Sequence, residues 1–386
     1  MNPPDQAIEL LDRLVSFPTV SRDGNLRLID FVRERLRAVG VSATLVPSPG
    51  GDKAALFATV GPARDNGIVL SAHTDVVPVD GQPWTSDPFR LTERGGRLIG
   101  RGALDMKAYL ACILAIVPEA ARGRLSRPLH LAFSYDEEIG CQGIRPLLGA
   151  MAAAGIRASG CVVGEPTGMR IVRGHKGKLA GSIVCTGKAA HSALPHLGLN
   201  AIHLGADMVG ALRRIQADIE AQGARDDAYA VPFTTVHVGT IHGGTALNVI
   251  PERCAISFEI RHLADDDPHA VLDRIREAAG RLGAAARKSC EGADIAVAID
   301  NAYPGLETPP GAEIVRLAQA AGGIDAGEKV TFGTEAGVFQ EALGIPSIVC
   351  GPGDMVRAHK ADEYVTREEL GACEAFLRRL VGELAA

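Results

Sequence analysis

Four short apolar runs, each followed by histidine or acidic residues, constrain the fold of this chain more than any other feature. A short run rich in aliphatic and β-branched residues predicts a buried strand. In an open α/β sheet, ligands bind at the carboxyl ends of the strands. Polar groups from distant parts of the chain are therefore expected at one edge of one sheet. The runs and the groups that follow them are 67–72 with His73 and Asp75, 129–135 with Asp136, Glu137 and Glu138, 161–164 with Glu165, and 347–351 with His359.

The composition is that of a globular protein with a large core. The chain has 386 residues, which is long for one domain, so two domains are expected. The net charge is −6 and no Lys/Arg-rich block is present, which argues against nucleic acid and anionic membranes as partners. No apolar run approaches the ~20 residues needed to span a bilayer. The chain also begins without the basic and then apolar pattern of a secretory signal.

The eight cysteines are scattered and form no C-x-x-C pair. Several lie inside apolar runs, where a buried, reduced thiol is the ordinary interpretation. The pattern argues against a disulfide scaffold and against a thiolate zinc site. It predicts a reducing environment and hence a cytoplasmic location.

Strands and helices alternate in the first part of the chain. Amphipathic repeats predict helices and β-branched runs predict strands. This alternation predicts an α/β fold with a mostly parallel sheet covered by helices. The predicted helices are 5–16, 25–39 and 106–116, and the predicted strands are 43–47, 54–60 and 68–71.

The pattern changes near Leu179 and changes back near Pro309. Between these points the elements follow a β-α-β-β-α-β order, which is typical of a two-layer α+β sandwich. We therefore predict a catalytic domain formed by residues 1–178 and 306–386, interrupted by an inserted domain at 179–305. The elements predicted for the insertion are strands 181–186, 234–240, 254–261 and 295–299 and helices 199–219 and 268–282.

His73 and Asp75 are two residues apart, so they share a face if the strand continues through them. A metal-bound histidine usually has its other ring nitrogen held by a carboxylate or a carbonyl. This pair is therefore a candidate for a metal ligand and its support. Taken alone, it equally suits a buried histidine that is hydrogen-bonded to an aspartate without any metal.

The three consecutive acids at 136–138 follow a buried strand, where adjacent carboxylates repel unless a cation compensates. One of them can bind a metal while its neighbour acts as general base. Alone, they suit a solvated acidic turn, and Asp105 alone suits a helix N-cap. Together, two histidines and three carboxylates match a two-metal hydrolase, in which one carboxylate bridges ions roughly 3.5–4 Å apart and a water becomes nucleophilic at neutral pH.

Six segments of this chain resemble the M20 family of zinc amidohydrolases and peptidases. They occur in the family's order and span most of the chain. The segments are 71–78 (Ser-Ala-His-Thr-Asp-Val-Val-Pro), 84–89 (Trp-Thr-Ser-Asp-Pro-Phe), 100–107 (Gly-Arg-Gly-Ala-Leu-Asp-Met-Lys), 136–140 (Asp-Glu-Glu-Ile-Gly), 164–167 (Gly-Glu-Pro-Thr) and 358–364 (Ala-His-Lys-Ala-Asp-Glu-Tyr).

The resemblance implies a zinc-exopeptidase-like catalytic domain with two zinc ions, for which cobalt or manganese are possible substitutes. His73 and Glu165 would bind one ion, and Glu138 and His359 the other. Asp105 would bridge both ions.

Further roles follow from the same resemblance. Glu137 would be the general base and then the general acid, and Asp75 would orient His73. The peptide bond between Asp105 and Met106 would be cis.

The inserted domain corresponds, by resemblance, to the family's lid, through which the chain would form a homodimer. His191 matches the lid histidine that stabilises the oxyanion, commonly from the other subunit. Asn248 and Arg261 match lid residues that hold the substrate. A guanidinium suits a substrate carboxylate because it can bind it bidentately.

Within the family, three segments resemble the acetylornithine deacetylase branch: 332–337, 351–364 and 174–178. This implies hydrolysis of the small molecule N2-acetyl-L-ornithine to L-ornithine and acetate in arginine biosynthesis, with Glu335 facing the δ-ammonium group. Arg357 and the pair Asp354–Met355 depart from the commonest form of the second segment, which leaves the substrate open.

Other functions remain possible on these residues. The chain could be a related deacylase or dipeptidase acting on another N-acyl amino acid, such as N-succinyl-diaminopimelate. It could also be a non-enzymatic binding protein on the same scaffold, although all the expected ligands and the base are present. A nucleotide-binding protein is disfavoured, since neither G-x-G-x-x-G nor G-x-x-x-x-G-K-[ST] follows an early strand.

Overall fold

The computed structural model describes residues 3–62 and 65–385, which form two compact units. The first unit comprises the chain up to Gly174, Leu306–Lys329 and the chain from Thr334 onwards. The second comprises His175–Gly305 and Val330–Gly333. Among the described residues, no helix is both long enough and apolar enough to cross a lipid bilayer.

The centre of the first unit is a six-stranded sheet made, in spatial order, of β1 (Ala43–Pro47), β2 (Ala54–Val60), β6 (Leu129–Ser134), β3 (Gly67–His73), β7 (Ala158–Pro166) and β16 (Ser347–Gly351). The last four strands are parallel to one another, while β1 and β2 are antiparallel to their neighbours. Every residue of β3, β6 and β16 is buried. Strands covered on both faces need continuous apolar runs, and this is the pattern from which the sheet was predicted.

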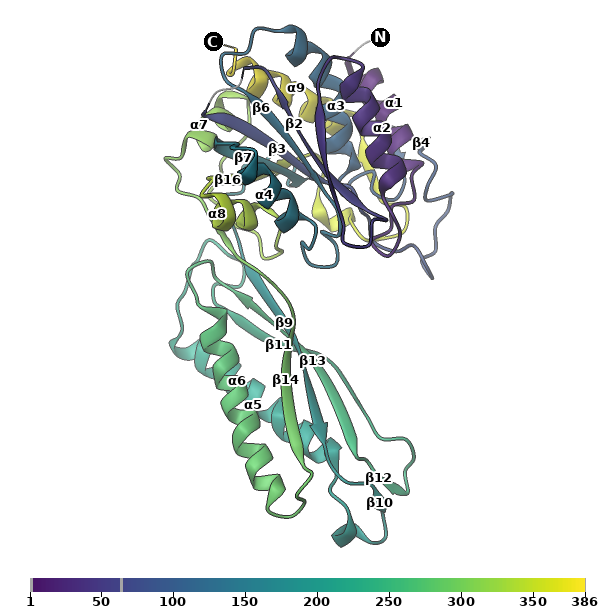
Figure 1. The fold of residues 1–386 in the computed structure, drawn as a ribbon, viewed down its shortest axis with the longest axis vertical. Helices are drawn as coiled ribbons and strands as arrows, with labels where there is room; N and C mark the ends of the chain where they lie inside the picture. The colour runs from purple at the N-terminus through teal and green to yellow at the C-terminus, as the bar shows by residue number, and fades with distance from the viewer. Residues whose placement is uncertain (1–2, 63–64, 386) are drawn as a thin grey trace. The chain divides into compact units, whose positions relative to one another are not determined.

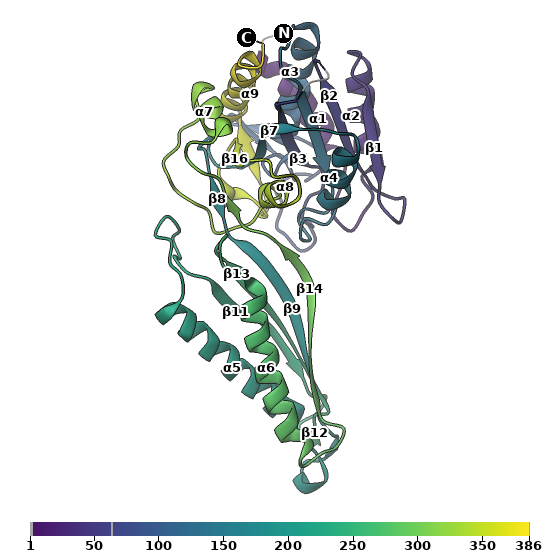
Figure 2. The ribbon, with the colours of Figure 1, turned by 60° about the vertical axis from the view of Figure 1, so that its left-hand side comes forward.

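Helices cover both faces of this sheet (Figure 1, Figure 2). One face carries α1 (Pro3–Val15), α2 (Leu26–Arg37), α3 (Lys107–Arg122) and α9 (Arg367–Gly382), with α3 packed against both α1 and α9. The other face carries α4 (Ile144–Ala153) and α8 (Ala336–Leu343), and α7 (Glu313–Ala320) lies beside β7 and α9. The predicted α/β fold with a mostly parallel, helix-covered sheet is therefore confirmed.

Helix α3 is apolar on all sides and is buried along most of its length, as expected for a helix enclosed by other elements. Its N-terminus follows Asp105, so burial of α3 fixes the position of that carboxylate. The peptide bond between Asp105 and Met106 is cis, as the resemblance implied. The predicted end of this helix at residue 116 is wrong: α3 runs through Pro118 to Arg122.

Several short elements complete the first unit. A three-stranded sheet has the order β17 (Tyr364–Thr366), β5 (Arg97–Ile99) and β4 (Thr92–Arg94). This small sheet joins the chain just before Asp105 to the chain just after His359. The remaining short elements are β8 (Gly174–His175), β15 (Leu306–Glu307) and the 3-10 turn η2 (Met355–Arg357).

The second unit is a two-layer α+β sandwich. Its four-stranded antiparallel sheet has the order β11 (Thr235–Gly243), β13 (Arg253–His262), β9 (Gly177–Thr186) and β14 (Asp294–Tyr303). Helices α5 (Ala201–Gln222) and α6 (Pro268–Arg287) pack on the sheet (Figure 1). Burial alternates along β9, so Leu179, Ile183 and Cys185 belong to the core beneath the helices and the residues between them lie on the opposite, half-buried face.

One end of the second unit carries a two-stranded ribbon of β10 (Ala190–His191) and β12 (Val249–Ile250), next to the 3-10 turn η1 (Pro195–Leu197). Exposed apolar side chains concentrate at this end, around a groove of about 720 Å³. They are Leu194, Leu197, Ile202, Ile241, Leu247 and Val249.

Candidate metal centre

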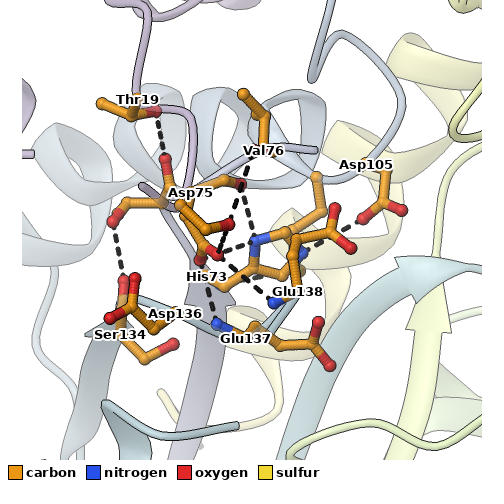
Figure 3. Close-up of polar contacts among 12 residues, drawn as sticks. Thr19, His73, Asp75, Val76, Asp105, Ser134, Asp136, Glu137 and Glu138 are labelled. Carbon is orange, nitrogen blue, oxygen red and sulfur yellow. Dashed lines mark hydrogen bonds and ion pairs between the residues drawn. The ribbon is translucent and has the colours of Figure 1, made fainter. Parts of the chain in front are cut away.

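The carboxyl ends of the parallel strands place acidic and histidine side chains at one edge of the central sheet. His73 is the last residue of β3, and the acids at 136–138 directly follow β6 (Figure 3). Glu165 is near the end of β7, and His359 lies beyond the end of β16. All of these residues belong to the first unit.

Asp105 lies between the two histidines and gives one carboxylate oxygen to each. Its Oδ1 is 3.1 Å from Nε2 of His73, and its Oδ2 is 3.1 Å from Nε2 of His359. His73 Nε2 is also 3.5 Å from Oε1 of Glu165, and His359 Nε2 is 3.0 Å from Oε2 of Glu138. The arrangement is two imidazole–glutamate pairs joined by one shared aspartate.

The chemistry of this donor set fits divalent metal ions. Ligand atoms of His73, Glu137 and Glu165 lie within 4.8 Å of one another, as do those of His73, Asp105 and Glu138. Oε1 of Glu138 is buried and has no hydrogen-bond partner. Four carboxylates so close together require compensating positive charge, and mixed imidazole and carboxylate ligands suit zinc and similar ions.

The protonation of the centre shows the same excess of negative charge. Burial, and then the charge of Asp105, raise the pKa of Glu138 to about 7 and that of Glu165 well above its ordinary value. Hydrogen bonds to Asp105 and Glu138 raise the pKa of His359 to about 10. Burial alone would lower the pKa of His73, but its hydrogen bonds to Asp105 and Asp75 raise it well above the ordinary value. In the metal-free chain, therefore, the two imidazolium groups supply the positive charge.

Asp75 supports the centre through both its backbone and its side chain. Nδ1 of His73 is 2.9 Å from the backbone oxygen of Asp75 and 3.5 Å from its carboxylate. The carboxylate accepts hydrogen bonds from the backbone N–H groups of Glu137 (3.1 Å) and Glu138 (3.2 Å) and from the hydroxyl of Ser21 (2.7 Å). Asp75 thus orients His73 mainly through its carbonyl, while its carboxylate holds the loop that carries the two glutamates.

That loop begins with a left-handed residue, Asp136, at φ 57°. Lys53 fixes this turn, since its Nζ is 2.7 Å from Oδ1 of Asp136. Figure 3 shows that Glu137 and Glu138 leave the loop in different directions, with Glu138 turned toward Asp105.

Glu137 is free to act on a ligand rather than on its neighbours. Its Oε1 receives only a long contact from the Sγ of Cys141 (3.5 Å) among the side-chain hydrogen bonds of the described residues. Burial and the charge of Glu138 raise its pKa well above the ordinary value. A carboxylate of raised pKa suits proton transfer near neutral pH. The sequence analysis did not identify Cys141, Ser21 or Lys53.

Glu335 lies at the N-terminus of α8 and is 1% exposed. Burial raises its pKa to about 7, while the hydroxyl of Ser134 acts in the opposite direction. Its Oε1 has no hydrogen-bond partner. Its charge contributes to the raised pKa of Glu137, after burial and the charge of Glu138.

The other three predicted site residues lie in the second unit. His191 in β10 and Asn248 just before β12 are exposed neighbours, linked by a hydrogen bond from the N–H of Ser192 to the carbonyl of Asn248 (3.0 Å). Arg261 is half-buried on β13, where it donates to Glu259 (3.2 Å) and to the hydroxyl of Tyr303 (3.1 Å).

Arg261 lies at the opposite end of the second-unit sheet from the His191–Asn248 pair. Only two residues lie between β12 and β13, so Cys254 marks the end of β13 that is next to the ribbon. From Cys254 to Arg261 the strand advances seven residues, or about 24 Å at the rise of an antiparallel strand. This distance is much longer than an N-acetyl amino acid. The structure therefore does not bring these three residues together within one chain.

Comparison with known proteins gives consistent results. Residues 69–383 match the profile of Peptidase family M20/M25/M40. The chain is 37% identical to an acetylornithine deacetylase of Myxococcus xanthus over 96% of this chain and 95% of that protein. It is 31% identical to an acetylornithine deacetylase of Pasteurella multocida over 97% of each. Its fold is similar to the crystal structure of an M20 family metallo-carboxypeptidase from Sulfolobus solfataricus, with a TM-score of 0.80, 19% identity and 99% of both chains covered.

Binding of a divalent metal should release protons and should tighten as the pH rises. The raised pKa of His359, about 10, leaves its ring protonated at pH 6–8 in the metal-free chain, whereas a metal needs the neutral ring. We expect the apparent affinity for zinc to rise roughly 10-fold per pH unit for each proton released. Calorimetric titration at pH 6, 7 and 8, in buffers of different ionisation enthalpy, measures the affinity for zinc and the number of protons released on binding. His269→Asn, at an exposed position on α6, is the control and should not change the proton count; an affinity independent of pH would contradict the prediction.

Proposed function

The chain belongs to Peptidase family M20/M25/M40, whose members are metal-dependent hydrolases of amide bonds, and we propose that it is a two-zinc deacylase that converts N2-acetyl-L-ornithine to L-ornithine and acetate. The observation that carries the proposal is the position of Asp105, with one oxygen toward each of two histidines. The name carried by two full-length relatives supports acetylornithine as the substrate. Arginine biosynthesis is the pathway that this reaction would serve.

We assign His73 and Glu165 to one ion, Glu138 and His359 to the other, and Asp105 to both. Zinc is the ion proposed, with cobalt or manganese as substitutes, because the ligands are imidazoles and carboxylates. When bound, the two ions act as Lewis acids that polarise a carbonyl group and lower the pKa of water.

The residues of the chain then perform the proton transfers. Glu137 takes a proton from the attacking water as its oxygen bonds to the acetyl carbon. Glu137 next gives this proton to the substrate nitrogen as the C–N bond breaks, so acetate and the free amine leave. The raised pKa of Glu137 supports this double role. His191 would donate a hydrogen bond to the developing oxyanion.

A homodimer is part of the proposal because one chain cannot place all its substrate-binding residues at one site. β13 alone spans about 24 Å between Arg261 and the end of the sheet that is next to the β10–β12 ribbon of His191 and Asn248. If all three serve one substrate, the His191–Asn248 pair must come from a second copy. The exposed apolar side chains around these two residues, Leu247 above all, suit burial against that copy. In this proposal residues 179–305 form the lid and the dimer interface.

The two ends of the substrate are assigned to different residues. Arg261 would bind the α-carboxylate, since its guanidinium is half-buried and already directed by Glu259 and Tyr303. Glu335 would face the δ-ammonium group, since it is a buried carboxylate with an unpartnered oxygen. We also propose a cytoplasmic location, in keeping with eight free cysteines.

The proposed activity predicts a specific order of substrates. Metal-stripped enzyme reconstituted with zinc or cobalt should release ornithine from N2-acetyl-L-ornithine with a higher kcat/KM than for N-succinyl-diaminopimelate or neutral acetyl amino acids. Amine release measured for this panel is the test. A preference for another member of the panel would keep the two-metal chemistry and reassign the substrate. No metal-dependent turnover of any member would contradict the proposal.

Replacement of the proposed base should separate chemistry from metal binding. Glu137→Ala should keep both metal ions and lose several orders of magnitude in kcat, because only proton transfer is removed. Metal content and turnover are measured on the same sample. A metal-depleted variant would show instead that Glu137 is a ligand.

The same variant tests the shared site. The Glu137→Ala and His191→Ala chains are unfolded, mixed in equal amounts and refolded together. About a quarter of wild-type activity should return, because half of the dimers contain one chain of each variant and one of the two sites in such a dimer is complete. No recovery would place His191 at the site of its own chain or outside any site.

Two substitutions should affect the two ends of the substrate differently. Arg261→Lys should raise KM for every acetyl amino acid tested, because a lysine cannot bind a carboxylate bidentately. Glu335→Gln should lose activity on acetylornithine and keep activity on neutral acetyl amino acids. Steady-state kinetics on acetylornithine and on a neutral acetyl amino acid measures both effects. Equal losses on all substrates for Glu335→Gln would remove it from the specificity site, and an unchanged KM for Arg261→Lys would do the same for Arg261.

A further inference from the structure

A fully buried ion pair, Arg101 with Glu363, lies next to the metal centre and has no role in the proposed chemistry. Nη1 of Arg101 is 2.5 Å from Oε2 of Glu363, and both side chains are 1% exposed. Burying two charges costs free energy that their attraction does not reliably recover, so such a pair is weak evidence for stability. Its remaining contacts indicate what else it does.

The second oxygen of Glu363 holds the backbone that carries the shared aspartate. Oε1 of Glu363 accepts hydrogen bonds from the N–H groups of Leu104 (2.9 Å) and Asp105 (3.1 Å). These residues lie three and two positions before the start of α3. Glu363 therefore fixes the position from which the Asp105 carboxylate reaches both histidines.

Arg101 holds the chain on the other side, at His359. Its Nη1 donates to the carbonyl of Lys360 (3.3 Å), and its Nη2 donates to Oε1 of Gln82. Nε2 of Gln82 in turn donates to the carbonyl of His359 (3.0 Å). The guanidinium also lies over the ring of Trp84, 5.0 Å from its centroid, and the indole N–H donates to Gln82 (3.0 Å).

His359 needs this support because its own surroundings are open. It lies outside any helix or strand, has a left-handed backbone with φ 62°, and its side chain is 50% exposed. Asp105 is 254 residues away in sequence. Arg101 and Glu363 join these two distant segments in one set of hydrogen bonds.

We propose that Arg101, Glu363 and Gln82 form a positioning network that sets the distance between the Asp105 carboxylate and the His359 ring and thereby the affinity for metal. The inference rests on the proposed metal site, since it assumes that Asp105 and His359 are ligands. Mutation of a group that hydrogen-bonds to a metal ligand and orients it typically lowers metal affinity about 10–100-fold. Glu363 acts on the ligand shared by both ions, whereas Gln82 acts only on the segment of His359.

The two positions therefore predict different patterns of metal loss. In the metal-stripped full chain, Glu363→Gln should weaken cobalt binding about 10–100-fold at both sites, because Asp105 serves both. Gln82→Met should lower the cobalt affinity of only one of the two sites. Both variants should lower kcat more than they change KM for acetylornithine. Cobalt titration followed by visible absorption and calorimetry, with Tm measured alongside, gives these quantities.

Glu93→Gln is the matched control, because Glu93 also pairs with an arginine, Arg367, but lies exposed on β4. It should change neither cobalt affinity nor kcat. If Glu363→Gln lowers Tm while both cobalt affinities stay at the wild-type value, the network is structural only and the proposal is wrong.

The other possible outcomes of the cobalt titration also test the proposal. If Glu363→Gln does not fold, Gln82→Met alone is the test, since Gln82 is half-buried, and unchanged binding of both ions overturns the proposal. If the wild-type chain binds two cobalt ions and neither variant loses cobalt affinity, the positioning network is overturned and the proposed function stands. Wild-type chain that binds no cobalt overturns both.

Discussion

The mutual repulsion of buried carboxylates is the constraint on which the first unit depends. Asp105, Glu138 and Glu165 are brought together by chain segments that are far apart in sequence, and the imidazole groups of His73 and His359 lie against them. Such a cluster is unfavourable without a cation, since burial, and then the charge of Asp105, raise the pKa of Glu138 and Glu165. A divalent ion that bound only the assembled cluster would stabilise the folded unit by mass action. Folding of the sheet and affinity for metal would thus be coupled.

The fold was largely predictable because burial on both faces of a parallel sheet demands continuous apolar runs, and those runs are visible in the sequence. β3, β6 and β16 are the clearest cases. The end of α3 was not predictable in this way. Local rules end a helix before Pro118, but Val117 and Ala120 are buried in the core, and their packing carries the helix past Pro118 to Arg122.

The site was predictable only in part, for a related reason. The rule that strand ends meet at one sheet edge brings His73, Glu138 and Glu165 close together without any knowledge of side-chain contacts. It says nothing about turns, and the left-handed backbones of Asp136 and His359 decide where their neighbours point. The partners that hold those turns, such as Lys53, come from elsewhere in the chain. Pairings of this kind leave no local pattern in a single sequence.

The acids around the centre divide by what their oxygens meet. Asp75 and Glu363 each accept two backbone N–H groups, so their charge is satisfied by the protein and they hold chain segments in place. The carboxylate oxygens of Asp105 each lie 3.1 Å from an imidazole, and Glu138 retains a buried oxygen without a partner, so their charge would be available to a cation. All four residues are acids within the segments that resemble the family, and residue type alone cannot separate them. The backbone amides that reach Asp75 and Glu363 separate these two supports from Asp105 and Glu138, the two proposed ligands.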